Sequence, residues 1–216
     1  PAGLRQGQAI QSGAAFVLTL HPTQCIQIMY SSANTSTAPA THIAPSLADT
    51  RWFNALWFQS TWFFAVLGRE AFLPAILLMI ALHLFLARNT SRELLLLSSV
   101  AAIGIGADAI LHVVGIYQFA GTALVPLWLC GLWLAFATTL TRSLAFLGQR
   151  PWLAALAGAV ALPLNYWAGQ RLGAVSFGYS LPVTLAVIAV TWGVLLPVMY
   201  RLSALIDTAT RREGQP

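Results

Sequence analysis

Residues 94–116 read LLLLSSVAAIGIGADAILHVVGI, and this stretch decides the fold class. About twenty predominantly apolar residues in a helix are enough to cross the hydrocarbon core of a membrane. The run contains one carboxylate, Asp108, and neither Lys nor Arg. A helix on a soluble core would carry charged residues along its outer face. The stretch therefore predicts a transmembrane helix.

The composition of the whole chain gives the same answer. Hydrophobic residues make up 58% of the chain and charged residues 8%, against roughly a quarter charged in soluble domains. The net charge is +5, and every basic residue is Arg. These arginines lie between apolar runs, as in membrane proteins, and do not gather into the basic patch that nucleic-acid binding requires. A soluble fold and a nucleic-acid partner are both excluded.

Six apolar segments qualify, or nearly qualify, as transmembrane helices. They cover residues 52–68, 71–88, 94–116, 123–147, 152–171 and 181–203. The first two are short and closely joined, which indicates a tight hairpin or a tilted helix. We predict an all-α fold, a polytopic membrane helix bundle of about six transmembrane helices within residues 51–205.

The segments that flank this domain differ from it. Residues 1–50 are rich in Ser, Thr, Ala, Gln and Pro and lack the pattern of a signal peptide. We expect a disordered tail there, with Met29 as the true start. Residues 206–216 predict a short basic cytoplasmic tail.

The arginines also predict the orientation. If the six segments alternate, eight arginines fall on the side of the N-terminus and two on the other side. Cytoplasmic loops carry the excess of Lys and Arg. We therefore expect a membrane protein, in contact with the lipid bilayer, with both termini in the cytoplasm.

Asp108 and His112 are the most informative polar residues inside the predicted spans. A charged carboxylate at this depth costs about 2.5–3.5 kcal/mol, so it normally faces the bundle interior. His112 follows four residues later on the same helix face. The pair is consistent with a hydrogen-bonded structural contact, or with catalysis in which Asp108 orients His112 as a base. A metal site would need a third ligand, which the sequence does not offer at that depth, so none is predicted.

Further polar residues suggest a pocket. Pro163 frees backbone groups in the fifth segment, and Asn165 and Tyr166 follow it. Asn165 would bond a neighbouring helix, or Asn165 and Tyr166 would join Asp108 and His112 in one outward-facing pocket. The remaining pocket candidates lie towards the cytoplasmic side: Asn54 and Gln59 in the first segment, and Arg142 in the fourth. Arg142 would snorkel to the interface or contact a phosphate or lipid head group.

Several motifs resemble a known family. They are WFNALWFQ at 52–59, Asp108 with GIYQF at 115–119, PLWL at 126–129 with WLAFATT at 133–139, and PLNYWAG at 163–169. Together they resemble an uncharacterised bacterial membrane-protein family, domain of unknown function 2878. No catalytic role carries over from it. Genes of the family lie near those for cyclopropane-fatty-acid-synthase-like enzymes, photolyases and flavin amine oxidases. The resemblance thus implies a location in the bacterial inner membrane and a part in membrane-lipid modification or photo-oxidative stress.

Three functions remain open. The leading expectation is an accessory protein, partnered with a lipid-modifying enzyme, or a small lipid-handling enzyme that uses Asp108 and His112. The second is a small permease or proton-coupled carrier, and the third is a structural assembly partner. The chain lacks the P-loop, GxSxG and HExxH motifs. Whether it is an enzyme, which substrate or cofactor it uses, and its oligomeric state are not determined by the sequence.

Overall fold

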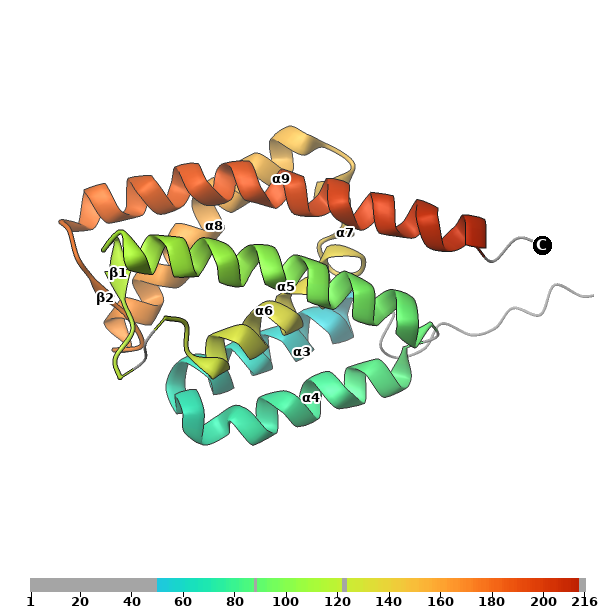
Figure 1. The fold of residues 1–216 in the computed structure, drawn as a ribbon, viewed down its shortest axis with the longest axis horizontal. Coiled ribbons are helices and arrows are strands. Elements are labelled where there is room, and N and C mark those ends of the chain that lie inside the picture. The colour runs from blue at the N-terminus through green and yellow to red at the C-terminus, as the bar shows by residue number, and fades with distance from the viewer. Residues whose placement is uncertain (1–49, 88, 122–123, 214–216) are drawn as a thin grey trace, which may run out of the picture. The chain divides into compact units, whose positions relative to one another are not determined.

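The computed structural model describes residues 50–87, 89–121 and 124–213. The predicted N-terminal tail, with Met29, lies outside these ranges. Six main helices follow one another in the described chain and alternate in direction (Figure 1). They are α3 (Arg51–Phe63), α4 (Leu73–Leu86), α5 (Thr90–Val113), α6 (Leu127–Leu140), α8 (Pro151–Arg171) and α9 (Leu181–Glu213). The predicted all-α helix bundle is confirmed.

The first two helices form the tight hairpin that their spacing predicted. A π-helical turn, η2 (Phe64–Gly68), and a 3-10 turn, η3 (Arg69–Phe72), reverse the chain between them. Arg69 has a φ of 51°, which is unusual for a residue with a side chain. Across the hairpin, the Thr61 hydroxyl donates to the Met79 sulfur at 3.4 Å.

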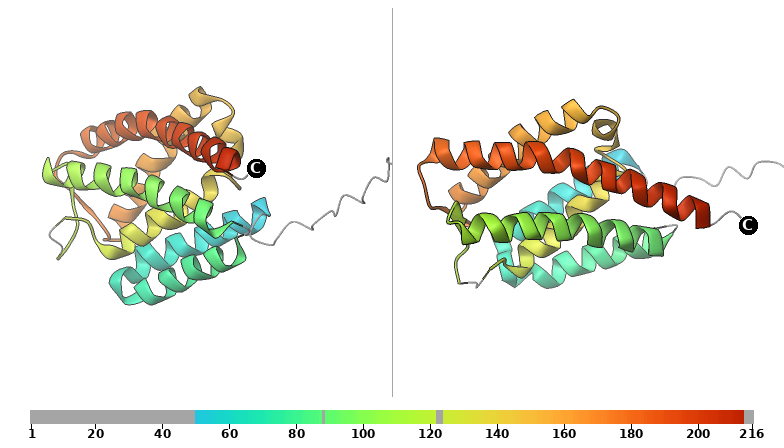
Figure 2. Two further views of the ribbon diagram at one scale, coloured as in Figure 1. Left: turned by 45° about the vertical axis from the view of Figure 1, so that its right-hand side comes forward. Right: turned by 45° about the horizontal axis from the view of Figure 1, so that its top comes forward.

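Because successive helices run in opposite directions, the loops lie at the two ends of the bundle. At one end, Arg92 of α5 pairs with Asp207 of α9, and the Tyr200 hydroxyl donates to the Leu144 carbonyl at 2.8 Å. We call this the arginine-rich end. At the opposite end, the α5–α6 and α8–α9 loops pair as a short antiparallel ladder. Its strands are β1 (Tyr117–Gln118) and β2 (Ser176–Phe177), so we call this the β end (Figure 2).

Helix lengths differ from the predicted spans in two places. The predicted segment 123–147 holds a shorter helix, α6, of 14 residues, followed by a loop and the single turn α7 (Ala145–Gly148). Fourteen residues reach about 21 Å, less than the roughly 30 Å of a hydrocarbon core. Conversely, the tail expected from residue 206 continues α9 as helix to Glu213.

Three helical stretches in the described chain are long and apolar enough to cross a membrane. They are Arg51–Leu86, which includes both arms of the hairpin, Thr90–Val113 and Leu181–Thr210. Large apolar side chains on the outer faces are exposed, such as Trp52 at 86% and Phe85 at 84%. Exposed apolar surface of this extent fits contact with lipid better than with water.

Glycines allow the closest helix contacts in the core. A Cβ at Gly158 of α8 would lie 2.2 Å from the Trp192 carbonyl oxygen of α9, so only glycine permits this approach. On the other side of the contact, Trp192 and Ile188 are completely or almost completely buried. The α8–α9 pair thereby provides a rigid wall for the site described next.

Candidate functional site

Asp108 is the centre of a buried polar cluster near the β end. Its side chain is fully buried, and three donors satisfy its oxygens. Oδ1 accepts from the Tyr117 hydroxyl at 2.6 Å and also from the Tyr166 hydroxyl. Oδ2 accepts from Trp133 Nε1 at 2.7 Å. We call these four residues the Asp108 cluster. The hydrogen bonds offset the cost of removing the carboxyl group from water.

Each donor in the Asp108 cluster comes from a different element. Trp133 of α6 reaches Asp108 because Gly104, one turn earlier on α5, has no side chain; a Cβ there would lie 2.2 Å from the Trp133 ring. The β1–β2 ladder holds Tyr117, which pairs with Phe177. Burial raises the pKa of Tyr117 above its ordinary value and Asp108 raises it further, so the phenol keeps its proton and donates.

The Tyr166 ring, from α8, completes the cluster. It stacks on Tyr117, with ring centroids 5.0 Å apart. Together the two rings cover the carboxyl group from the side of α8. The cluster thus joins α5, β1, α6 and α8 through one carboxyl group.

His112 does not pair with Asp108, contrary to the expected hydrogen-bonded contact. Its half-buried ring stacks on Phe119, with centroids 5.7 Å apart, and no hydrogen bond joins it to Asp108 in the described structure. Both Asp108 oxygens accept instead from the three aromatic donors. A catalytic role for either residue stays a prediction. The described residues contain no group of three or more His, Cys, Asp or Glu side chains that could hold a metal.

An apolar cavity of about 220 Å³ adjoins the Asp108 cluster. Trp133 and Tyr166 belong to both, so Asp108 lies directly behind the cavity wall. Aromatic and aliphatic side chains from α3, α6 and α8 form most of the lining, among them Phe58, Trp62, Trp128, Phe136, Ala161 and Leu162.

Asn165 also lines this cavity. One of the two expectations was a hydrogen bond from Asn165 to a neighbouring helix, and the described structure does not contain it. Its Nδ2 donates to the Ala161 carbonyl of its own helix at 2.8 Å. The structure therefore brings Asn165 and Tyr166 to one cavity next to Asp108. His112 and Gln59 are not among the residues that line it.

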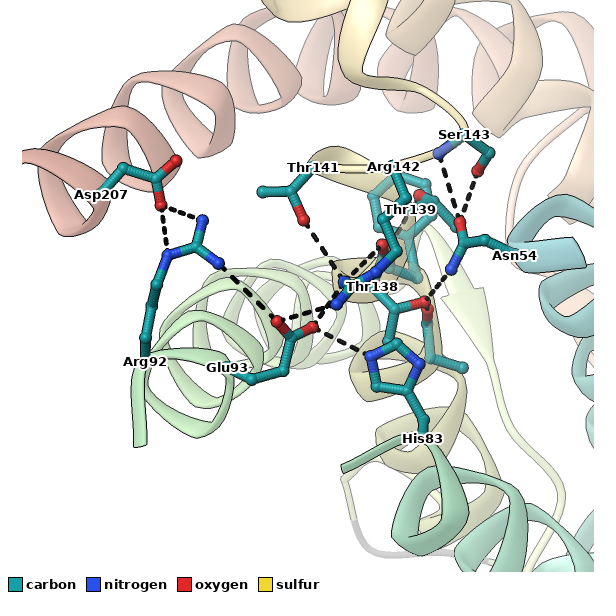
Figure 3. Close-up of polar contacts among 12 residues, drawn as sticks. Asn54, His83, Arg92, Glu93, Thr138, Thr139, Thr141, Arg142, Ser143 and Asp207 are labelled. Carbon is teal, nitrogen blue, oxygen red and sulfur yellow. Dashed lines mark hydrogen bonds and ion pairs between the residues drawn. The ribbon is translucent and has the colours of Figure 1, made fainter. Parts of the chain in front are cut away.

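A second buried cluster lies at the arginine-rich end, around Glu93 of α5 (Figure 3). Arg142, in the turn after α6, donates to both oxygens of Glu93, at 2.6 and 3.1 Å. Nε2 of His83, from α4, lies 2.9 Å from Oε1. Arg92 lies 3.9 Å from Oε2 and bonds Asp207 of α9. These five residues, with Asn54, Thr138 and Ser143, are the Glu93 cluster.

Asn54 links α3 to the Glu93 cluster. Its Nδ2 donates to the Thr138 hydroxyl at 3.1 Å, and its Oδ1 accepts from the Ser143 hydroxyl at 2.7 Å. Asn54 is 1% exposed, whereas Gln59 points to the exterior. The two predicted pocket residues of the first segment therefore do not share a site.

The sequence predictions missed the core of this second cluster. Arg142 was expected to snorkel or to bind a head group, yet it is buried against Glu93. His83 is 4% exposed, and the sequence did not mark it as a site residue. A signal was present: Glu93 directly precedes the run 94–116, and Arg142 lies near the end of another apolar run on the same predicted side. Opposite charges at matched depth favour an ion pair.

Fold and sites together define the class of protein. The chain is an all-α bundle with helices long and apolar enough to cross a membrane, and α5 carries a buried carboxyl cluster towards each end. Residues 51–198 match the family described as "Protein of unknown function (DUF2878)", and the chain belongs to that family. The resemblance seen in the motifs is thereby confirmed. No curated protein and no solved structure matches the chain.

Proposed function

We propose that this is an integral membrane protein that handles lipid by holding one lipid chain in the cavity beside the Asp108 cluster. The observation that carries the proposal is the cavity lining, which is aromatic and aliphatic apart from Asn165 and the polar atoms of the Tyr and Trp side chains. Its volume of about 220 Å³ is below the roughly 300–1,000 Å³ of sites for drug-sized ligands. One chain fits such a space better than a whole phospholipid.

Asp108 acts in this proposal as a positioning residue. It holds the Trp133 indole and the Tyr166 phenol by hydrogen bonds, and both rings form the cavity wall. A bound chain comes from the bilayer, where it already lies among apolar tails, so the cavity attracts it only through van der Waals contacts with a wall of fixed shape. This role suits either an accessory protein or a small enzyme of lipid modification.

The test is to identify lipid that purifies with the protein. Protein purified in mild detergent is extracted with organic solvent, and the extract is analysed by mass spectrometry. Ala161→Phe fills the cavity and should remove most of the bound lipid, whereas Val160→Phe, exposed on the same helix, should retain it. Wild-type protein without lipid above the detergent background, or an Ala161→Phe variant that retains it fully, would contradict the proposal.

The part in lipid modification is tested in cells. The lipid profile of a deletion strain is compared after complementation with wild type or with Asp108→Asn. We expect wild type to restore a lipid species that Asp108→Asn does not restore, although the variant inserts. An unchanged lipid profile would contradict a part in lipid modification and would leave only lipid binding.

A proton-coupled carrier is the second candidate, because two carboxyl groups lie buried on one helix. Glu93 is 2% exposed and Asp108 fully buried, and their spacing of fifteen residues corresponds to about 22 Å along α5. In proteoliposomes loaded with a pH-sensitive dye, a carrier would move protons when its substrate is added, and Asp108→Asn would abolish the signal. Panels of amino acids, sugars and organic acids are the probes, and no response to any of them counts against this candidate.

The proposal places the protein in a bacterial inner membrane, with both termini cytoplasmic. The support is the excess of arginines in the loops of one end, where Arg51, Arg92 and Arg142 lie. The positive-inside rule assigns that end to the cytoplasm.

A further inference from the structure

A second hollow lies beside the apolar cavity and faces the β end. Phe119, Ala174 and Val175 line both spaces, so the two are adjacent. The second hollow measures about 390 Å³ and lies between β1 and the loop that follows α8. We call it the vestibule.

The vestibule is more polar than the cavity, and its described lining carries no ionisable side chain. Its polar side chains are the carboxamides of Gln118 and Gln170 and the hydroxyl of Ser176. Gln118 donates to the His112 carbonyl at 3.2 Å, while the Gln170 carboxamide bonds no other described residue. Arg69 reaches the same loop, where its Nη2 donates to the Leu172 and Gly173 carbonyls, but its side chain is not part of the vestibule lining.

We propose that the cavity and vestibule form one site for a single-chain lipid with an uncharged, hydroxyl-bearing head. The inference rests on the proposed function: the chain fills the cavity, and the head lies in the vestibule. A carboxamide offers a donor and an acceptor, which matches a hydroxyl group that also offers both. A phosphate or carboxylate head would instead call for Arg or Lys donors facing it. The lining supplies carboxamides and no such cation.

The experiment uses the tryptophans of the cavity as reporters. Trp62, Trp128 and Trp133 line it, so a bound chain carrying bromine atoms quenches their fluorescence. Full-length protein in nanodiscs is titrated with three lipids that share one dibromostearoyl chain: the monoacylglycerol, the free fatty acid and the lysophosphatidate. We expect saturable quenching by all three, with the monoacylglycerol binding about tenfold more tightly than the lysophosphatidate.

Variants separate head recognition from chain binding. Gln170→Leu should weaken monoacylglycerol binding about three- to tenfold and leave the fatty acid unchanged. Gln59→Leu, an exposed glutamine outside both hollows, is the matched control and should change neither. Ser176→Ala is the second variant, used if Gln170→Leu does not fold.

The experiment distinguishes failure of the uncharged-head proposal from failure of chain binding. Tightest binding by the lysophosphatidate or the fatty acid, or an equal effect of Gln170→Leu on all three lipids, overturns the uncharged head. An absence of saturable quenching by any lipid, or quenching that Ala161→Phe does not reduce, overturns chain binding and with it the proposed function.

Discussion

At the scale of single residues, Asp108 depends on a glycine four positions before it. Gly104 leaves the space that the Trp133 ring occupies, whereas a Cβ at Gly106 would meet nothing within 4 Å. Both glycines lie on α5 close to Asp108, but only Gly104 admits a neighbouring side chain in the described contacts. The two positions therefore form a matched pair for mutagenesis.

We predict that Gly104→Ala destabilises the protein and Gly106→Ala does not. The added methyl group at position 104 must displace the Trp133 ring and weaken its bond to Asp108, at a cost of about 1–3 kcal/mol in unfolding free energy. Thermal unfolding in detergent, followed by tryptophan fluorescence, measures both variants. Equal melting temperatures for the two would show that the Trp133 contact is unimportant.

Asp108→Asn tests the hydrogen bonds themselves. An indole N–H can only donate, so the new amide carbonyl must face Trp133 and its NH2 group must face the tyrosines, whose hydroxyls can rotate to accept. We expect a loss of about 1–3 kcal/mol in unfolding free energy. Tyr166→Phe should cost less when combined with Asp108→Asn than in wild type, because the carboxylate acceptor is gone. Additive losses would contradict coupling between these residues.

At the scale of elements, the Glu93–Arg142 pair joins α5 to the turn after α6, and the other members of its cluster reach α3, α4 and α9. Removing one partner of a buried pair leaves an uncompensated charge and costs about 3–5 kcal/mol. We predict this loss for Arg142→Leu and a smaller one for the double variant Arg142→Leu/Glu93→Leu. Chemical unfolding in mixed micelles measures all three proteins. A double variant less stable than the single one would be the contrary outcome.

At the scale of the whole molecule, the fold separates an arginine-rich end from a β end. Ser176 at the β end and Thr208 near the end of α9 are both exposed, so each accepts a cysteine. In spheroplasts, with Cys25 and Cys130 replaced by Ser, a membrane-impermeant maleimide should label Ser176→Cys. Thr208→Cys should react only after permeabilisation, because positive-inside orientation puts the arginine-rich end in the cytoplasm. The reverse labelling pattern would invert the proposed topology.

The sequence by itself determined the all-α class and the six helical segments, because long apolar runs can satisfy their backbone only as helices in lipid. For the first two segments it left a hairpin and a tilted helix open, and the structure shows the hairpin of α3 and α4. It also predicted that Asp108 faces the interior of the bundle, since a carboxyl group that faces lipid is costly. It could not determine the partners. Local spacing favoured His112, four residues away, whereas the donors to Asp108 stand 9, 25 and 58 positions away. Only the packing of β1, α6 and α8 around α5 brings those donors together, as it brings Arg142 to Glu93.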